Sequence, residues 1–183
     1  MNRRAVLSLI ASMPFAVCAR PPSPVFEEAG AAPYALGTGD KLRVIVFGQD
    51  NLSNVYAVDS VGRISMPLVD VVPVAGLTTQ HAERAIEAKL RNGFIREPRV
   101  AVEIDTFRPF YILGEVVTPG QYPYVNGLTI QKAAAIASGF TPRGDQYNAE
   151  ITRQVKGGIV VATVPITYPI RPGDTIVIKE RWF

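Results

Sequence analysis

The side chains that most often carry catalysis are scarce in this sequence. His81 is the sole histidine and Cys18 the sole cysteine among 183 residues. Nucleophilic catalysis needs a base within hydrogen-bonding distance of the nucleophile, and that base is usually a histidine. His81 falls on a predicted helix among polar neighbours, so we expect it on the surface. One histidine and one cysteine cannot form a histidine- and cysteine-rich metal site, so we predict no metal and no other cofactor.

Carboxylates are the remaining groups that could perform acid–base chemistry, and five of them lie beside predicted turns. These are Asp40, Asp59, Glu115, Asp145 and Asp174. A glycosidase needs two such groups facing each other across a cleft. An aspartate next to a glycine more often accepts hydrogen bonds from its own turn. We therefore interpret these carboxylates as turn residues and predict that the chain is not an enzyme.

A Gly-Asp phrase occurs twice, as LGTGDKLRVIVFG at residues 36–48 and as IRPGDTIVIKERWF at residues 170–183. The first copy lacks the G-x-G-x-x-G spacing of a phosphate-binding loop and precedes a predicted strand rather than a helix. Both copies have the pattern of a turn followed by a strand. We expect them to be structural turns.

The N-terminus has the pattern of a secretory signal peptide over residues 1–18. Arg3 and Arg4 precede an apolar run at residues 5–17, which is shorter than the roughly 20 residues of a membrane span. A segment rich in proline and alanine follows at residues 19–33 and is predicted to be a flexible linker. We expect the chain to be exported from the cytoplasm.

Cys18 leaves two interpretations of this signal open. It can become the lipid-bearing first residue of a lipoprotein, although Val17 stands where Gly, Ala or Ser is usual. Ordinary cleavage after Ala19 is the alternative. In either case a single cysteine forms no internal disulfide, so the folded part must be stable without one.

Composition and charge exclude further classes of protein. Apolar residues make up 48% of the chain, too many for a disordered protein. The formal charge of +3 includes Arg3 and Arg4, so it falls to +1 without the signal. Residues 84–108 carry six basic and four acidic side chains, which is typical of a solvated surface. No motif that reads RNA or DNA accompanies them, and we predict no nucleic-acid partner.

Residues 34–107 have the pattern of a small sheet-and-helix module. Strands are predicted at 41–47 and 99–105, with two more on either side of a turn at 59–62. A helix is predicted to begin after Thr78 as N-cap and to stop at Gly93. Its predicted buried face consists of Ala82, Ile86 and Leu90.

Residues 108–183 predict a second module of the same α+β class. Pro119 and Gly120 are predicted to occupy the centre of a type II turn, with Gly120 at positive φ. A helix is expected between Thr129 as N-cap and Gly139, followed by a hairpin and a last strand at residues 175–178. Two strands, a helix, a hairpin and a final strand resemble a β-grasp (ubiquitin-like) domain.

Five phrases, in this order, resemble the bacterial outer-membrane polysaccharide export family. They are YALGTGDKLRVIVFG, VDSVGRISMPLVDVVPVAGLTTQHAERAI, FYILGEVVTPGQYPY, LTIQKAAAIASGFTPRGD and RPGDTIVIKERWF. The resemblance covers about residues 34–183. It implies a polysaccharide export domain at 34–107 and a soluble ligand-binding β-grasp domain at 108–183.

The resemblance carries a set of turn residues over to this sequence. They are Gly39, Asp40, Asp59, Gly62, Gly114, Glu115, Pro119, Gly120, Gly173 and Asp174. We expect them to shape the modules rather than to contact sugar. Asp70 and Ser138 stand where the family often has glycine, so we expect altered turns at these two positions.

The resemblance also implies a non-enzymatic role in the periplasm, with a lipid anchor in the outer membrane if Cys18 is acylated. Family members form homo-oligomeric rings through which capsular polysaccharide or exopolysaccharide leaves the cell. An inner-membrane polysaccharide co-polymerase is the implied partner. Arg108, Tyr111 and Arg143 are candidate polysaccharide contacts, chosen for their charge or aromatic surface near predicted loops.

The sequence stops at Phe183, directly after the last predicted strand, where long family members continue into a membrane helix. We therefore expect a short form that works with a separate outer-membrane β-barrel channel, because only helices and closed barrels satisfy the backbone in lipid. The alternative is a monomeric periplasmic adaptor that binds a saccharide or a partner without forming a pore.

Overall fold

The described part of the chain comprises residues 33–155 and 158–181 of a computed structural model. The predicted signal peptide, Cys18 and nearly all of the predicted linker lie outside these residues. The described residues contain two α-helices and three β-sheets and all belong to one compact unit. This confirms the α+β class that the sequence predicts.

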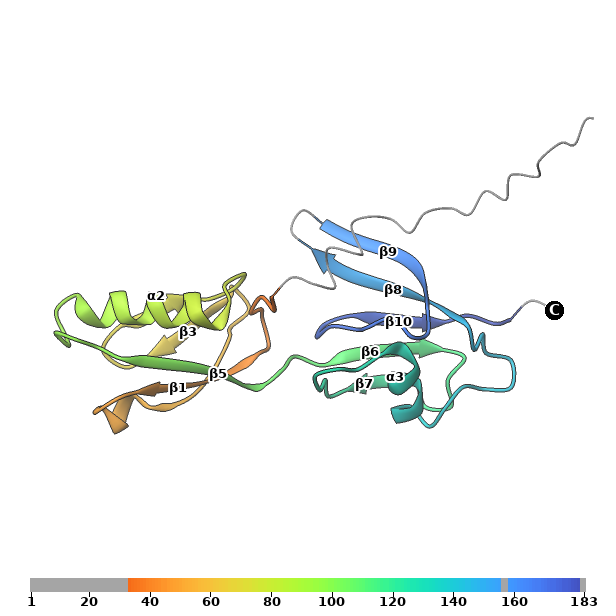
Figure 1. Cartoon of the computed structure of the whole chain (residues 1–183), viewed down its shortest axis with the longest axis horizontal. Coiled ribbons are helices and arrows are strands. Elements are labelled where there is room, and N and C mark those ends of the chain that lie inside the picture. Colours follow the sequence, from red (N-terminus) through yellow and green to blue (C-terminus); the bar gives the residue numbers. More distant parts are fainter. Residues whose placement is uncertain (1–32, 156–157, 182–183) are drawn as a thin grey trace, which may run out of the picture. The chain divides into compact units, whose positions relative to one another are not determined.

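The first sheet has three antiparallel strands in the order β2-β1-β5. Strands β1 and β5 lie side by side in Figure 1. Strand β1 spans Lys41–Val46, β2 spans Asn54–Ala57 and β5 spans Val100–Thr106, with a short 3-10 helix, η1 (Asp50–Leu52), after β1. The apolar residues of β1 alternate with polar or exposed ones, so one face of the strand is buried. The inward side chains are Leu42, Val44 and Val46.

Strands β3 (Arg63–Met66) and β4 (Asp70–Pro73) pair with each other in a separate two-stranded sheet. The predicted turn at residues 59–62 therefore connects two sheets rather than two paired strands. The carbonyl of Gly62 accepts the N–H groups of Val74 and Ala75. These bonds tie the turn to the chain that follows β4.

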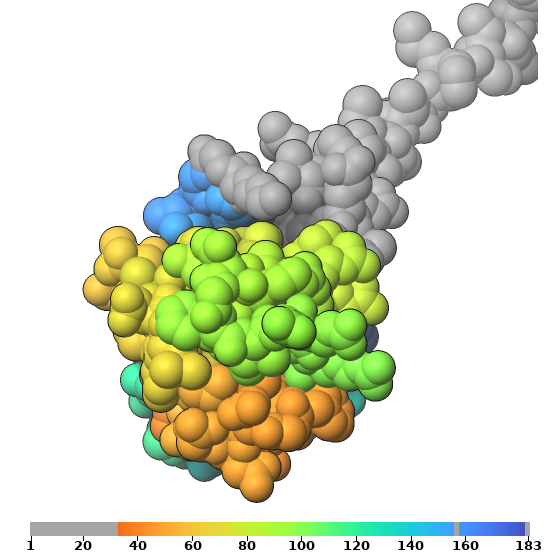
Figure 2. Space-filling view, turned by 90° about the vertical axis from the view of Figure 1, so that its left-hand side faces the viewer, coloured from red at the N-terminus to blue at the C-terminus, as the bar shows by residue number. Residues whose placement is uncertain are grey.

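Helix α2 (Thr79–Arg91) begins where the sequence predicts, because the Thr78 hydroxyl accepts the N–H of His81. It packs against β5 and β4. Its buried face consists of Ala82, Ile86 and Leu90, as predicted. In the space-filling view, the green α2–β5 region lies beside the orange segment that contains β1 and η1 (Figure 2).

The third sheet has five strands in the order β7-β6-β10-β8-β9. Strand β10 is parallel to β6, and every other neighbouring pair is antiparallel. The strands are β6 (Phe110–Gly114), β7 (Gly120–Tyr122), β8 (Asn148–Val155), β9 (Gly158–Pro165) and β10 (Thr175–Ile178). Helix α3 (Ile130–Ile136) follows β7, with Thr129 as the predicted N-cap.

Asp70 and Ser138, the two departures from glycine, both lie at left-handed backbone positions, with φ of 56° and 68°. Glycine adopts this conformation without strain, whereas other residues lose roughly 1 kcal/mol or more. At these positions the backbone therefore takes a glycine-like conformation although the side chain is not glycine.

The predicted type II turn at Pro119 and Gly120 is wrong. Gly120 is the first residue of β7 and has no positive φ. The glycine with a left-handed backbone in this connection is Gly114, at φ 84°. A Cβ there would lie 2.1 Å from the Ile178 carbonyl oxygen, so close packing against β10 also requires glycine.

Across the described ranges, we find no helix that is both long enough and apolar enough to cross a membrane.

Candidate functional site at the two Gly-Asp turns

The two Gly-Asp phrases fold into the same turn. In each, the aspartate N–H donates to the carbonyl three residues earlier: Asp40 to Gly37 at 3.2 Å, and Asp174 to Arg171 at 3.1 Å. Each carboxylate then accepts the N–H of that earlier residue, at 2.8 Å and 2.6 Å respectively. The preceding glycines, Gly39 and Gly173, have φ of 91° and 85°, which favours glycine.

Both carboxylates are buried, with Asp40 0% and Asp174 1% exposed. A buried carboxylate loses its hydration and needs hydrogen bonds or a cation in place of water. Each turn therefore requires partners from elsewhere in the chain. The two turns obtain these partners in different ways.

Asp174 pairs with Arg153, a residue of the neighbouring strand β8. The guanidinium binds both carboxylate oxygens, Nε to Oδ1 at 2.9 Å and Nη2 to Oδ2 at 2.7 Å. Arg153 itself is only 4% exposed. Burial alone would lower the pKa of Arg153, but its hydrogen bonds and charge pairing with Asp174 raise the pKa above its usual value.

Asp40 is held mainly by hydrogen bonds. The Tyr34 hydroxyl donates to it at 2.7 Å, and the backbone N–H of Arg108 donates at 2.9 Å. Burial, and then the hydrogen bond to Asp40, raise the pKa of Tyr34 well above its usual value. Tyr34 therefore stays protonated and continues to donate to the carboxylate.

The Arg108 side chain links the two turns. Its Nη1 lies 4.0 Å from the Asp40 carboxylate, and its Nε donates to the carbonyl of Pro172 at 3.1 Å. A Cβ on Gly37 would lie 1.5 Å from Nη1, and a Cβ on Gly173 would lie 2.8 Å from Nε. Both glycines therefore provide the space that this guanidinium occupies.

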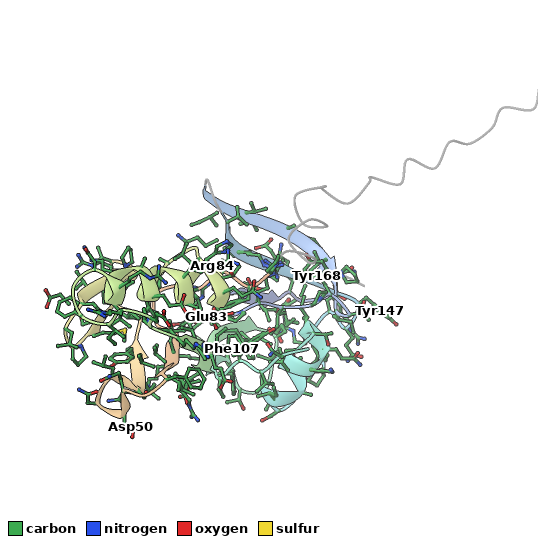
Figure 3. The ribbon with its side chains drawn as sticks, turned by 60° about the vertical axis from the view of Figure 1, so that its left-hand side comes forward. Asp50, Glu83, Arg84, Phe107, Tyr147 and Tyr168 are labelled. Carbon is green, nitrogen blue, oxygen red and sulfur yellow. The ribbon has the colours of Figure 1, made fainter. Side chains whose placement is uncertain are left out.

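Three aromatic rings pack together around the connection between β5 and β6. Phe107 contacts Tyr34 and Tyr124 edge to face, with centroids 5.2 Å and 5.3 Å apart. The Tyr124 hydroxyl donates to the carbonyl of Ile170. Phe107 lies in the connection between β5 and β6 (Figure 3). The connection is thus held by packing as well as by the hydrogen bonds of Arg108.

The remaining predicted turn residues serve local structure. Asp59 accepts the N–H groups of Val61 and Arg63, and the hydrogen bond from Arg63 is the main cause of its lowered pKa. Glu115 accepts a hydrogen bond from the Thr141 hydroxyl. A Cβ on Gly62 would lie 2.3 Å from that of Ala75.

The three candidate polysaccharide contacts do not form one site. Arg108 binds the carbonyl of Pro172, which precedes β10, whereas Arg143 forms an ion pair with Glu180, after β10, at 2.7 Å. Tyr111, on β6, is 41% exposed. The arginines thus lie near opposite ends of β10. Sugar binding by any of the three remains a prediction.

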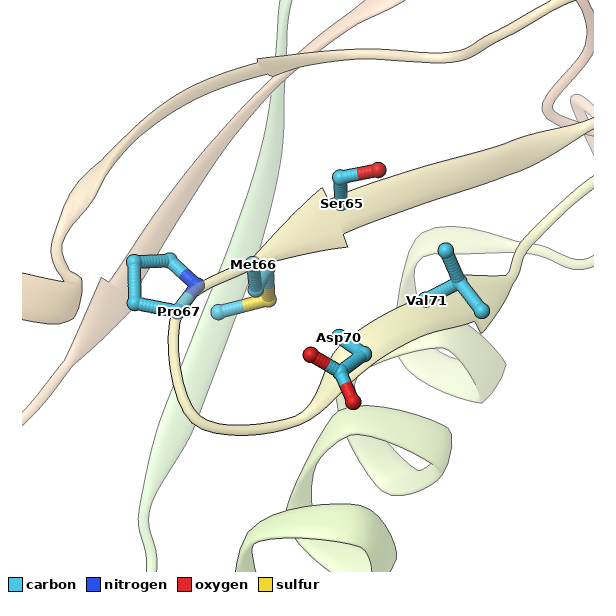
Figure 4. Close-up of a pocket in the computed structure, with 5 residues that line it drawn as sticks. All are labelled: Ser65, Met66, Pro67, Asp70 and Val71. Carbon is cyan, nitrogen blue, oxygen red and sulfur yellow. The ribbon is translucent and has the colours of Figure 1, made fainter.

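A pocket of about 350 Å³ lies at the tip of the β3–β4 hairpin (Figure 4). Its lining consists of Ser65, Met66, Pro67, Asp70 and Val71. Asp70 is the one ionisable residue in this lining, so the pocket does not bring an acid and a base together.

Within the described part of the chain, no group of three potential metal ligands occurs. His81 is exposed, as predicted, and its Nδ1 lies 2.8 Å from the Thr78 hydroxyl oxygen.

Two residues of this candidate site, Arg153 and Tyr34, were not predicted from the sequence. Arg153 carried a usable signal. It shares the inward phase of the AEITRQV strand with Ala149 and Ile151, and a charged residue at an inward position needs a buried partner. Tyr34 carried no such signal, because its contact with Asp40 depends on how the chain folds back at the turn.

Two stretches of the chain match known family models. Residues 28–105 match the family model for polysaccharide biosynthesis/export proteins, and residues 109–164 match the model for the SLBB domain. The two matches follow each other along the chain. The chain belongs to the polysaccharide biosynthesis/export family.

Curated relatives include the EPS I polysaccharide export outer membrane protein EpsA of Ralstonia solanacearum, 27% identical over 84% of this chain and 49% of the relative. The exopolysaccharide production protein ExoF of Rhizobium meliloti is 37% identical over 61% of this chain and 29% of the relative. The polysialic acid transport protein KpsD of Escherichia coli is 26% identical over 62% and 21%. The chain spans at most about half the length of these relatives.

Proposed function

We propose that this chain is a non-enzymatic component of a polysaccharide export machinery. The observation that carries the proposal is the succession of the two family matches, export domain first and SLBB domain second. The similarity to EpsA, whose name describes an outer-membrane polysaccharide exporter, supports it across most of the chain. The substrate is accordingly a capsular polysaccharide or an exopolysaccharide.

The second module is, in this proposal, a β-grasp domain formed by residues 108–183. Three features support it: the strand order β7-β6-β10-β8-β9, the parallel pairing of β10 with β6, and the position of α3 between β7 and β8 along the chain. The first module, residues 34–107, acts as the export domain. Arg108 stands at the boundary and contacts the Gly-Asp turn of each module.

In the proposed mechanism, copies of the chain form a ring in the periplasm and confine the growing polymer in a hydrated channel. An inner-membrane polysaccharide co-polymerase delivers the polymer. Rigid modules suit this role because a ring repeats one contact many times and a loose module would disturb each contact. At both turns, a buried aspartate that accepts hydrogen bonds from several groups provides that rigidity.

Deletion of the gene tests the role. We expect secreted polysaccharide to be lost and to return when the wild-type gene is restored. A normal amount of secreted polysaccharide in the deletion strain would contradict the proposal.

Complementation with variants tests sugar contact. Tyr111→Ala is expected to reduce export, and the matched variant Tyr147→Ala, at an exposed tyrosine outside the predicted contacts, is expected to leave export unchanged. Equal export by both variants would remove Tyr111 from the proposed polymer path.

The mass of the purified protein separates a ring from an adaptor. A stable cyclic oligomer supports the ring, whereas a monomer that binds saccharide supports the monomeric periplasmic adaptor.

A further inference from the structure

The edge of a β-sheet exposes backbone N–H and C=O groups with which another strand can pair, unless something blocks them. The three-stranded sheet ends in β2 and β5, and the five-stranded sheet ends in β7 and β9. Three of these four edges are blocked or restricted, and β9 is open.

The β5 edge is blocked by side chains of helix α2. Glu83 Oε1 accepts the N–H of Val102 at 3.0 Å, and Glu87 Oε1 accepts the N–H of Val100 at 3.2 Å. Glu83 is labelled in Figure 3. These two carboxylates occupy the donors that an incoming strand would need.

The β2 and β7 edges are restricted in other ways. On β2, the Asn54 side chain accepts the N–H of Val55 at 2.8 Å. Strand β7 has three residues and is flanked by Pro119 and Pro123, which lack a backbone donor. Neither edge offers a long run of available donors.

Strand β9 exposes its outer groups along most of its length. The pairing Val155↔Gly158 and the bond from the Ile166 N–H to the Tyr147 carbonyl define which residues of β9 face β8. The backbone N–H and C=O groups of successive residues in a strand alternate between its two neighbouring sides. The N–H and C=O groups of Ile159, Val161 and Thr163 therefore point away from β8. Among the residues that the structure describes, no hydrogen-bond partner of these groups is found.

The side chains of this strand do not protect it. The sequence GIVVATVP contains no charged residue, and its only proline lies at the end of the strand. Ile159 is 70% exposed and Val161 54% exposed. Native proteins usually protect such an edge with a charge, a bulge or a short strand. In Figure 1, β9 lies at one edge of its sheet.

We propose that the β9 edge pairs with β9 of a second copy of this chain, in antiparallel orientation about a two-fold axis at Val161. In this register Val161 faces its own copy and Ile159 faces Thr163. The three outward residues form three hydrogen-bonded pairs, about six N–H···O=C bonds in all. Two five-stranded sheets then become one continuous sheet.

The strand itself favours a second copy as the occupant. A second β9 supplies an edge of the same length with donors and acceptors at matching positions. It also places no like charges opposite each other, which would destabilise the pair. Two β-branched valines and two Ile–Thr pairs face each other instead, and β-branched pairs favour sheet pairing.

This contact is distinct from the contact that closes a ring. A ring requires two different surfaces on each copy, whereas a β9–β9 pair uses the same surface twice. The inference can therefore fail while the export role stands. Equally, normal secretion in a deletion strain would contradict the export role and leave β9 pairing untouched.

The first experiment measures the mass of the purified full-length protein against concentration by sedimentation. We expect reversible pairing that Val161→Lys weakens at least tenfold, because it places two like charges opposite each other. Val125→Lys is the matched control, since Val125 is 56% exposed and lies outside the strands. Circular dichroism checks that both variants fold.

The second experiment tests the register directly, in a Cys18→Ser background. Facing residues of a hydrogen-bonded antiparallel pair have Cα atoms about 5.5 Å apart, within the range for a disulfide. Mild oxidation should therefore join two copies of Val161→Cys. Ile159→Cys should not form a dimer, because residue 159 lies about 13 Å from its own copy along the paired strands.

Three results would overturn the inference. The first is a wild-type protein whose mass shows no two-fold association at any concentration. The second is equal association of the Val161→Lys and Val125→Lys variants, as in a ring closed by other surfaces. The third is equal cross-linking of Val161→Cys and Ile159→Cys. Cross-linking by Val161→Cys alone would support the proposed register even if Val161→Lys fails to fold.

Discussion

The two Gly-Asp turns share a backbone and differ in how the buried aspartate is stabilised. Asp174 binds Arg153 through two short hydrogen bonds; Arg153 lies on β8, and Asp174 directly precedes β10 of the same sheet. Asp40 is held by Tyr34 and by the backbone of Arg108, while the Arg108 guanidinium is more distant, at 4.0 Å. The Arg108 side chain is 31% exposed, against 5% for that of Arg153.

This difference separates two uses of one local motif. At Asp174 the aspartate completes the core of its own sheet. At Asp40 the same turn receives a residue from the connection between β5 and β6, so it contributes to joining the three-stranded and the five-stranded sheets. The Gly-Asp sequence therefore determines the turn, and the residues that bind its aspartate determine what the turn stabilises.

Loss of the charge at Asp174 is expected to have the largest effect. Asp174→Asn leaves the buried Arg153 cation without its counter-ion, and breaking such a pair costs about 3–5 kcal/mol. The free energy of unfolding in urea measures the loss. Asp105→Asn, which breaks the exposed pair with Arg43, is the control and should cost much less, because water screens exposed charges. Similar losses for both variants would contradict the expectation that the buried ion pair stabilises the fold more than the exposed one.

Asp40→Asn is expected to cost less, about 2–3 kcal/mol, because hydrogen bonds to a charged acceptor are lost but no buried cation is left unpaired. Urea unfolding again provides the measurement. A loss as large as that of Asp174→Asn would show that the two turns are stabilised alike, and the comparison would fail.

The link through Arg108 predicts that two different substitutions have the same effect. Arg108→Ala removes the guanidinium, and Gly37→Ala displaces it, because the new Cβ would occupy the position of Nη1. Each should cost about 1 kcal/mol, since the contact is partly exposed. In a double-mutant cycle the combined variant should lose little more than either alone. Full additivity would mean that Gly37 acts independently of Arg108.

Tyr34→Phe removes one hydrogen bond to the buried Asp40 carboxylate, and its distinctive effect is expected in alkali. The folded-state pKa of Tyr34 lies above its ordinary value of 10.0. Its contribution to stability is therefore complete below pH 10 and is lost as the pH rises through the folded-state pKa. We expect the stability of the wild type to fall more steeply above pH 10 than that of Tyr34→Phe.

Urea unfolding between pH 8 and pH 11 measures this slope. Tyr147→Phe, at an exposed tyrosine, is the control and should follow the wild type. Parallel curves for all three proteins would exclude titration of Tyr34 as the cause.

Local signals predicted most of the elements. The N-caps Thr78 and Thr129, the buried face of α2 and the last strand at 175–178 were all predicted from periodicity and capping. These features depend on residues only a few positions apart. The turn at Gly120 was predicted wrongly, because the Pro-Gly signal is local while Gly120 pairs with Ile112 across strands β6 and β7.

The sequence by itself determined both Gly-Asp turns, since each is closed by bonds between residues three positions apart. The tertiary structure alone decided which side chains reach the two carboxylates. Arg108 is 68 positions from Asp40, and Arg153 is 21 positions from Asp174. The choice between a cation within the same sheet and one at the connection depends on how strands distant in sequence pack together. That long-range packing makes one turn part of a core and the other part of a junction.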